Sequence, residues 1–333
     1  MASRKSSTRR SPKANRGAPR PSRALVLVNR KSGTVRSRGA EAVKALVEER
    51  LGKAFSRLDV ELIEGDATRR IERARDSGEY DVIIAGGGDG TISSAAGLLS
   101  GTSIILGALP LGTMNLFVQA LGFSSRLDEA LDQLSAAHIE EIDVGTVNGR
   151  VFLHQVSFGL QPRMARIRER IGYSSRLTKM LTGFRALLIV AANPKSVRVD
   201  VDADGKAQRV KAPLLIVSNN PLGAQSNVSL PRTLSSGQLG YYILSEFSLR
   251  MLFRLARDYL ANRIDANEAI EKHTAMALTI RKRSRSHSPR RRKRKLLSSI
   301  DGEIVHLDNP VSFAISPASL RVMSHASRAK ASS

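Results

Sequence analysis

The segment GGGDGT at residues 86–91 directly follows the apolar run DVIIA at 81–85. An apolar run of this kind is typical of a buried parallel strand, and four glycines around one aspartate leave the backbone bare where the strand ends. In open α/β sheets this end of a strand faces ligands, and backbone amides at the start of the next helix can hold an anion. The segment predicts a phosphate-binding turn around Asp89, with a plain strand-to-helix turn as the alternative.

The alternation of strands and helices extends over the first half of the chain. Apolar strands are expected within 24–29, 57–64, 80–87 and 103–110, with amphipathic helices between them. Strands that are apolar throughout and alternate with helices predict a parallel sheet covered on both faces.

The pattern changes near Asp143 to many short alternating strands. Hairpin turns are expected at VNGR (147–150) and DADGK (202–206), and helical segments interrupt at about 163–192 and 247–263. We therefore predict an N-terminal parallel-sheet α/β nucleotide-binding domain and a C-terminal, mainly antiparallel β-sandwich domain. The expected divisions are a disordered basic tail at 1–22, the α/β domain at 23–142, the sandwich at 143–323 with a basic insertion at 281–295, and a disordered tail at 324–333.

The net charge of +23 is concentrated in two segments. Residues 1–40 contain twelve Lys and Arg residues and no acid, and residues 281–295 contain ten and no acid. The other 31 basic residues nearly balance all 30 acidic ones, so the folded part is close to neutral. The charge therefore describes two appendages rather than a basic fold.

Targeting and redox features are few. No apolar run approaches the roughly 20 residues of a membrane span, and no apolar segment typical of a secretory signal lies near the start. The chain contains no cysteine, which excludes disulfides and thiolate metal sites and fits the cytosol.

Two further strand ends carry residues suited to phosphate. LPLGTMN at 109–115 follows the run SIILGA, and VNRKSGT at 28–34 begins where the first strand ends. Three such turns at one edge of a parallel sheet would face one crevice, which predicts a nucleotide phosphate site. The candidates are Asn29, Lys31, Ser32, Gly33, Gly87, Gly88, Asp89, Gly90, Thr91, Gly112, Thr113 and Asn115.

A candidate base lies in the second half. SIDGEIV at 299–305 places Asp301 and Glu303 at a turn between strands, and an exposed hairpin is the alternative interpretation. Phosphoryl transfer to an alcohol requires a carboxylate that accepts the hydroxyl proton, but spacing alone does not select Glu303. His154 lies in an expected strand, where a packed histidine is the simpler interpretation.

Five motifs, in this order, resemble the diacylglycerol kinase catalytic-domain family: VNRKSGT, GGGDGTIS, PLGTMN, IDVGTVNGRVFLHQVSFG and IDGEIVHLDNPVSFAISPASLRVM. That family includes bacterial soluble lipid kinases and the sphingosine and ceramide kinases, and the resemblance covers roughly residues 24–323. GGDGT alone also occurs in NAD kinases and phosphofructokinase-like folds. The combination with PLGT and a late DGE is more specific.

The resemblance implies an NAD kinase- or diacylglycerol kinase-like α/β domain joined to a lipid-binding β-sandwich, with ATP in the cleft between them. By match, Gly88, Asp89, Gly90 and Thr91 would hold ATP, together with Ile92, Ser93 and Thr113. Asp89 and Glu303 would be catalytic, with Glu303 as the base that activates the lipid hydroxyl. Asp143 would belong to a charge network near magnesium. ATP and Mg²⁺ are thus the expected cofactors.

Three departures from the family pattern concern this site. Ser93 and Ser94 stand where Asn-Glu is usual, and Leu116 stands where many members have Asp. Ser236 and Gly240 replace the two acids of a turn that often holds a structural magnesium, which argues against that metal in its usual form.

The predicted function is an ATP-dependent lipid kinase that phosphorylates a hydroxyl of a membrane lipid such as diacylglycerol or a sphingoid base. The alternative is a catalytically weakened nucleotide-fold protein that binds anionic membrane or nucleic acid through its basic segments. We expect a cytoplasmic protein, peripheral at the membrane, with basic segments 1–40 and 281–295 in contact with anionic lipid; nucleic acid is the less favoured partner because these segments lack aromatic residues. The lipid acceptor and the oligomeric state remain open.

Overall fold

The structure, a computed structural model, describes residues 22–171, 195–222, 231, 233–245, 270–283 and 295–325, with the backbone only for 167–171. The predicted tails lie outside the described residues, apart from their innermost positions. So do residues 284–294 of the basic insertion, residues 172–192 of the first expected helical segment and the whole of the second at 247–263.

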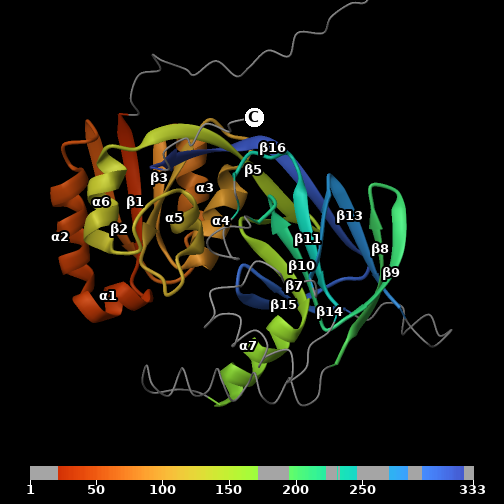
Figure 1. The fold of residues 1–333 in the computed structure, drawn as a ribbon. Coiled ribbons are helices and arrows are strands. Elements are labelled where there is room, and N and C mark those ends of the chain that lie inside the picture. The colour runs from red at the N-terminus through yellow and green to blue at the C-terminus, as the bar shows by residue number, and fades with distance from the viewer. Residues whose placement is uncertain are drawn as a thin grey trace, which may run out of the picture.

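The first half of the described chain alternates strands and helices as predicted, and Figure 1 shows it beside the all-β part. Its strands hydrogen-bond in the order β2-β1-β3-β4, and all three pairings are parallel. The elements are β1 (Arg23–Asn29), α1 (Gly33–Arg38), α2 (Ala40–Leu51), β2 (Arg57–Ile63), α3 (Thr68–Ser77), β3 (Val82–Gly87), α4 (Asp89–Leu99), β4 (Ile105–Pro110), α5 (Leu116–Ala120) and α6 (Leu127–Ser135).

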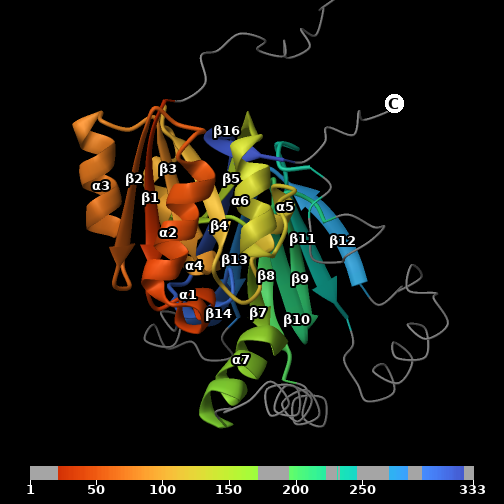
Figure 2. The same cartoon turned by 90° about the vertical axis from the view of Figure 1, so that its left-hand side faces the viewer.

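Helices cover both faces of this parallel sheet. α2 packs on β2 and α6, whereas α3 packs on α4, which in turn lies on β3 and β4 (Figures 1 and 2). The chain moves in one direction along the sheet from β1 to β2 and in the opposite direction from β2 to β3 and β4. Because each crossover is right-handed, connections in opposite directions place their helices on opposite faces of the sheet. β1, β3 and β4 are consequently buried on both sides along nearly their whole length.

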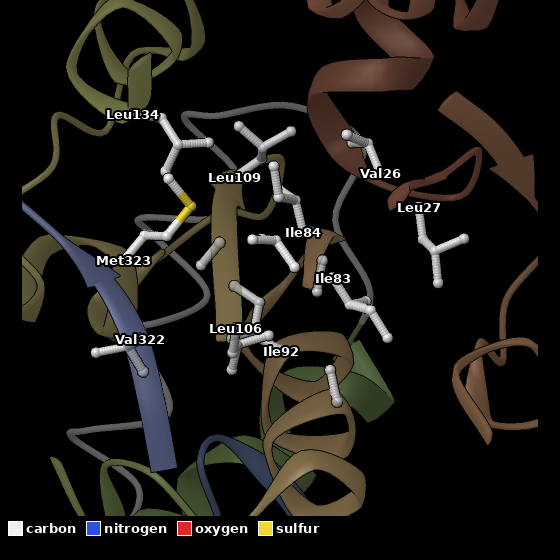
Figure 3. Packing of buried hydrophobic residues seen from close by; sticks show 14 of the residues in the cluster. Val26, Leu27, Ile83, Ile84, Ile92, Leu106, Leu109, Leu134, Val322 and Met323 are labelled. Atoms are coloured by element: carbon white, nitrogen blue, oxygen red, sulfur yellow. The ribbon is translucent and has the colours of Figure 1, made fainter. Parts of the chain in front are cut away.

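The core of this half is aliphatic (Figure 3). Leu27, Ile84 and Leu106 are fully buried in the sheet and Ile92 is fully buried on α4, while Met323 reaches the same cluster from the end of the chain. Burying each large aliphatic side chain stabilises the fold by about 1.5–3 kcal/mol. The N-terminal core therefore depends in part on the last strand.

The remaining strands form a sandwich. β16, β13, β8 and β9 extend the first sheet, with β5 and β6 beside β16, and the second sheet has the order β12-β11-β10-β7-β14-β15. Pairings within the second sheet are all antiparallel. The elements are β5 (His138–Val147), β6 (Arg150–Phe152), β7 (Gln155–Gly159), α7 (Leu160–Ile171), β8 (Val197–Ala203), β9 (Lys206–Ala212), β10 (Leu214–Asn219), β11 (Leu239–Leu244), β12 (Ile270–Ala275), β13 (Ala277–Lys282), β14 (Leu296–Ile300), β15 (Glu303–Leu307) and β16 (Val311–Ser324).

A second hydrophobic cluster fills the space between the two sheets. The Phe313 ring of one sheet lies edge-to-face with Phe158 of the other sheet and with Phe152 of its own, at centroid distances of about 6 Å. The predicted fold class, an α/β part with an antiparallel β-sandwich, is confirmed. One expected strand, QRVKAPLLIVSNN, is divided into β9 and β10, because Pro213 cannot donate a ladder hydrogen bond.

The predicted hairpin turns are present. Asn148 and Gly149 both have positive φ at VNGR, and Asp204 and Gly205 do at DADGK. These values fit the tight turns that favour Asn-Gly and Asp-Gly pairs. Local turn chemistry therefore fixes the β5–β6 and β8–β9 hairpins.

β16 joins the two parts of the fold. Residues 311–314 of β16 pair with β13, and residues 313–316 and 320–324 pair with β5 on either side of a bulge. Val322 pairs in parallel with Leu106 of β4. In Figure 1 it runs across the molecule from the sandwich to the α/β part. Residues beyond the expected boundary at 142/143 thus contribute to the N-terminal core, and the division into domains stays a prediction.

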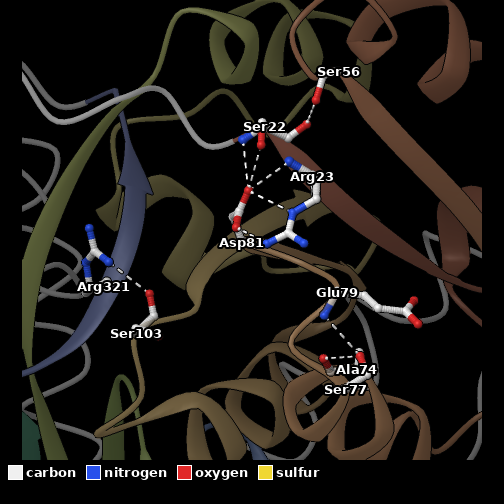
Figure 4. Close-up of polar contacts among 9 residues, drawn as sticks. All are labelled: Ser22, Arg23, Ser56, Ala74, Ser77, Glu79, Asp81, Ser103 and Arg321. Carbon is white, nitrogen blue, oxygen red and sulfur yellow. Dashed lines mark hydrogen bonds and ion pairs between the residues drawn. The ribbon is translucent and has the colours of Figure 1, made fainter.

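Asp81 fixes the start of the sheet (Figure 4). Its Oδ2 accepts hydrogen bonds from the Ser22 and Arg23 amides, each at 3.0 Å, and its Oδ1 lies 2.8 Å from the Arg23 guanidinium. The Arg23 guanidinium holds the pKa of Asp81 well below its usual value. On the other side of the sheet, Arg321 of β16 donates to the Ser103 carbonyl at 2.9 Å and ties the last strand to the residues that lead into β4.

None of the helices that the structure describes is long and apolar enough to cross a membrane.

Candidate functional site

The ends of β1, β3 and β4 lie at one edge of the sheet. The parallel registers align Val28 with Gly86, and Gly87 with Pro110, so the three turns that follow these strands are neighbours. The Thr34 amide also donates to the Leu111 carbonyl at 3.3 Å, which joins the first turn to the third. The sequence reasoning predicted this meeting of three polar turns.

Glycine is required where two of the turns touch. A Cβ added to Gly112 would lie 2.6 Å from the Cα of Gly88, closer than real Cβ atoms approach other atoms. Asn115 closes the same turn, because its Oδ1 accepts from the Gly112 amide at 2.9 Å and its Nδ2 donates to the Gly112 carbonyl at 3.3 Å. The backbones of the two turns therefore lie against each other, with little side-chain cover.

The first turn adds a cation and an unsatisfied hydroxyl. The side chain of Asn29 accepts from the Lys31 amide at 2.9 Å and donates to the Gly65 carbonyl at 3.2 Å. Lys31 is exposed and forms no ion pair within the described chain. The buried Ser32 Oγ has no hydrogen-bond partner among the described residues, next to Gly33 at the start of α1. A phosphate oxygen would satisfy both groups.

Asp89 begins α4 and faces the third turn. Gly88 precedes it as the N-cap, and Asp89 Oδ1 accepts from the Phe117 amide at 3.3 Å. Burial raises the pKa of Asp89; the Phe117 amide opposes the rise, and nearby Asp301 adds to it. The charged carboxylate is therefore under-compensated in the described chain, as expected of a group that faces a cation.

Asp89→Asn should stabilise the protein at neutral pH. Because the folded-state pKa is raised, the folded protein binds this proton more tightly than the unfolded chain, and stability is lost as pH rises through the raised pKa. In urea unfolding from about pH 4 to about pH 8, the free energy of unfolding of the variant should increase relative to that of the native protein as pH rises.

Asp81→Asn is the control of opposite sign. The pKa of Asp81 is lowered, so its contribution is present above the unfolded-state value and lost in acid. This variant should lose stability at neutral pH and converge with the native protein in acid. An Asp89→Asn protein that is less stable than the native one at neutral pH would contradict the prediction.

Asp301 anchors the second half to the first. Its Oδ1 accepts from the His154 and Gln155 amides and its Oδ2 from the Leu153 amide, each at 2.9 Å. The Ser93 hydroxyl of α4 donates to Oδ2 as well. This one carboxylate therefore holds β7, the β14–β15 turn and α4 together.

Glu303 lies beyond this anchor at the start of β15. A methyl group added to Gly90 would overlap its Oε1, so the Glu303 carboxyl lies against the glycine turn. Arg150 of the β5–β6 hairpin holds the other oxygen at 2.9 Å, and both side chains are about half exposed. An exposed ion pair of this kind contributes about 0–1 kcal/mol, so its main effect is on orientation.

Asp143 is almost fully buried and bound by the protein's own amides. Its Oδ2 accepts from Gly237 at 2.6 Å and its Oδ1 from Ala318 at 2.9 Å. Ser236 precedes Gly237 in this turn, and its amide donates to Oδ1 of Asn220 at 2.8 Å. Hydrogen bonds thus shape the turn at 236–237.

Within the described residues, no three His, Cys, Asp or Glu side chains gather as a metal site. A magnesium ion held mainly by protein carboxylates does not fit these residues. An ion carried by nucleotide phosphates needs only one or two carboxylates, and Asp89 could supply one. The network role of Asp143 near magnesium stays a prediction.

Other candidates occupy different positions. The side chain of Ile92 is fully buried in the core, so only its backbone is near the turn. Thr113 is exposed. Thr91 Oγ1 lies 3.5 Å from Asn29 Nδ2. His154 is buried beside Asp89 and Asp301, and burial lowers its pKa. A neutral, packed histidine fits the sequence interpretation.

Sequence reasoning gave no role to Arg150 or to the Asp301 anchor. Arg150 carried no usable signal, since it is one more basic residue in a hairpin turn. Asp301 could have been noticed, because an Asp-Gly pair favours the positive φ that both Asp301 and Gly302 adopt. Its amide partners are about 150 residues away and leave no local pattern.

The arrangement combines three features of a phosphoryl-transfer site. Bare backbone at helix starts, a free lysine and an unsatisfied hydroxyl suit phosphate oxygens. A half-buried carboxylate suits a cation, and an exposed carboxylate beside the glycine turn can accept a proton.

Comparisons with known proteins agree with this chemistry. Residues 23–147 match the model of the diacylglycerol kinase catalytic domain. A Staphylococcus haemolyticus protein with a provisional lipid kinase name is 26% identical over 273 residues, which are 78% of this chain and 82% of that protein. The diacylglycerol kinase of Bacillus subtilis is 27% identical over 58% of this chain and 64% of its own length.

The fold is also known from crystal structures. A diacylglycerol kinase from Bacillus anthracis superposes with a TM-score of 0.68 at 20% identity, over 92% of this chain and 98% of that one. Residues 23–147 therefore resemble the diacylglycerol kinase catalytic domain.

Proposed function

We propose that this protein is an ATP-dependent lipid kinase that transfers the γ-phosphate of ATP to a hydroxyl of a membrane lipid such as diacylglycerol or a sphingoid base. The observation that carries the proposal is the position of Glu303, whose carboxylate lies against Gly90 of the glycine turn. A base and a phosphate-binding turn that meet across two sheets are what transfer to an alcohol requires. The match of residues 23–147 to the diacylglycerol kinase catalytic domain and the similarity to lipid kinases support it.

In this mechanism the Glu303 carboxylate accepts the proton of the lipid hydroxyl while the hydroxyl oxygen attacks the γ-phosphate in line. Arg150 keeps the Glu303 carboxylate directed toward Gly90. Lys31, the Ser32 hydroxyl and the amides of residues 88–91 would bind phosphate oxygens. Magnesium bound with the nucleotide would neutralise phosphate charge, and Asp89 is the residue that would hold it. No covalent enzyme intermediate is needed.

The direct test is radiolabel transfer from ATP into lipid. The full chain is incubated with labelled ATP, Mg²⁺ and detergent micelles that contain diacylglycerol, monoacylglycerol, a sphingoid base or ceramide, one lipid at a time. We expect labelled phospholipid from one class and none without Mg²⁺. Zero transfer from every lipid, with ATP still bound, would overturn the proposal.

A catalytically weakened binding protein is the second candidate. Leu116, where many family members have an acid, favours it, as does the bonding of both Asp143 oxygens to backbone amides. In the same assay this protein would bind nucleotide without transfer.

Gly90→Ala should lower lipid phosphorylation by at least about tenfold with little change in stability. The added methyl group displaces the flexible end of Glu303, which costs little folding energy but moves the base. Gly97→Ala on the same helix is the control, because its methyl group would meet only Val151 at 3.5 Å. Full activity in Gly90→Ala would remove Glu303 from the proposed role.

The protein is further proposed to be cytoplasmic and peripheral at the membrane. Because its substrate would lie in a bilayer and the described helices contain no membrane span, contact with lipid must come from its surface. The basic segments 1–40 and 281–295 are the proposed contacts.

A further inference from the structure

A pocket of about 330 Å³ opens at the end of the sandwich where α7 begins. It lies between the two sheets, since Phe158 and Leu296 come from one and Val197 and Lys282 from the other. In Figure 1 this is the lower end of the sandwich, where α7 projects. Neither the predicted nucleotide site nor the proposed base contributes to its lining.

The pocket is distant from the nucleotide cleft. Its residues lie at the last positions of β7 and the first of β14, whereas the Asp301 anchor lies at the opposite ends of these two strands. Along β7, from Gln155 to Gly159, the separation is about 13 Å at the usual rise of a strand. It is therefore a second site rather than an extension of the first.

The lining is strongly cationic. Among the described residues it includes five basic side chains and no acid: Arg163, Lys195, Arg198, Lys282 and Arg283. In the described chain, only Arg283 has an acidic partner, Asp200 at 3.5 Å. Four positive charges thus gather around one opening without compensation, which attracts anions.

Arg163 supplies a second, independent observation. Its Nη1 is completely buried and has no hydrogen-bond partner among the described residues. A buried guanidinium nitrogen without an acceptor costs folding free energy, so such a group in a native protein calls for a ligand. Guanidinium forks match phosphate oxygens particularly well.

The inner surface of the pocket is apolar. Phe158 and Leu296 in its lining are buried side chains, and Val197 is partly buried. Free phosphate gains nothing from apolar surface. The only aromatic ring that the described residues contribute to the lining, that of Phe158, is buried in the core rather than exposed for base stacking. Cations beside apolar surface suit an anionic group on a hydrophobic body.

We propose that this pocket binds the headgroup phosphate of an anionic glycerophospholipid in the bilayer. The charged rim holds the phosphate, and the apolar part of the lining takes the adjoining part of the lipid. A neutral acceptor lipid would not balance four cations that lack an acidic partner among the described residues, so the bound lipid is a membrane component distinct from the substrate of the proposed kinase.

Binding is tested on the full chain, without ATP, so that the result does not depend on kinase activity. Short-chain phosphatidylglycerol below its micelle concentration is titrated while the melting temperature is recorded. At a hundredfold excess over its Kd it should raise the Tm by about 5 °C, whereas inorganic phosphate at equal concentration should not. An equal rise with inorganic phosphate, or a rise only with an RNA oligonucleotide, would overturn the proposal.

Lys195→Gln/Arg198→Gln is the test variant, because both side chains are exposed and their loss should leave the fold intact. Its matched control is Lys206→Gln/Lys211→Gln, which removes two exposed charges from β9 of the same sandwich. Vesicles of phosphatidylcholine with phosphatidylglycerol should bind the test variant about thirtyfold more weakly, at about fivefold per charge, and the control less than about threefold more weakly.

Arg163→Lys separates a pocket from a diffuse attraction. This variant keeps the charge but removes the planar fork, so it should abolish most of the Tm rise and weaken vesicle binding, although less than Lys195→Gln/Arg198→Gln does. If the test and control pairs weaken vesicle binding equally, or Arg163→Lys keeps the whole Tm rise, the charges act as a general basic surface and the pocket is not a lipid site.

Discussion

Glu303→Gln should lower lipid phosphorylation by about 10²–10⁴-fold, the usual contribution of a general base. The amide keeps the size of the side chain and its position beside Gly90 but cannot accept the proton. Stability should change by less than about 0.5 kcal/mol, because the carboxyl is half exposed and, within the described residues, pairs only with exposed Arg150.

The matched control for this variant is Asp308→Asn. Asp308 lies shortly after Glu303 in the chain and carries a more exposed carboxyl, paired with Lys295 at 3.5 Å. Initial rates for both variants, with ATP saturating and the accepted lipid varied, should show a loss of kcat in Glu303→Gln alone. Equal rates in the two variants would assign the base to another residue.

Asp301→Ala should destabilise the protein by about 3–5 kcal/mol. The substitution leaves the amides of Leu153, His154 and Gln155 without their acceptor, and each buried unsatisfied donor costs about 1–3 kcal/mol. Ser93 of α4 loses its partner as well, so the β14–β15 turn would no longer be held against the glycine turn. Urea unfolding measures the loss.

Asp204→Ala isolates the cause of this loss. Asp204 also has positive φ in a tight hairpin and accepts backbone amides, from Met276 at 3.0 Å and Ala277 at 2.8 Å, but it is exposed. Both substitutions remove an Asp that favours positive φ in a turn, but only the loss of Asp301 leaves buried amide donors without an acceptor. The control should lose about 1 kcal/mol, and equal losses would show that turn strain, not amide anchoring, explains the effect.

The parts of the site that follow local rules were predictable from the sequence. Apolar runs and glycine turns fixed the ends of β1, β3 and β4, and parallel pairing then brought Asn29, Gly88 and Gly112 together. The Asn-Gly and Asp-Gly pairs located two hairpins. In each case the information lies within a few neighbouring residues.

Long-range contacts were not predictable in this way. The Ser93–Asp301 hydrogen bond joins residues 208 positions apart, and the Arg150–Glu303 pair joins residues 153 apart. The pocket near α7 combines Arg163 and Lys195 with the edge of the basic insertion. Such contacts depend on how two sheets pack, and no single segment encodes that packing.

The path of β16 constrains how the protein can be made. Leu320, Val322 and Met323 belong to the N-terminal core, yet a ribosome synthesises them more than 200 residues after β4. Until then β4 has an unpaired edge and part of the aliphatic core lacks its partners. The N-terminal half therefore cannot complete its fold before residues 320–323 have been made, and a fragment ending near residue 147 would keep an exposed apolar edge that favours aggregation.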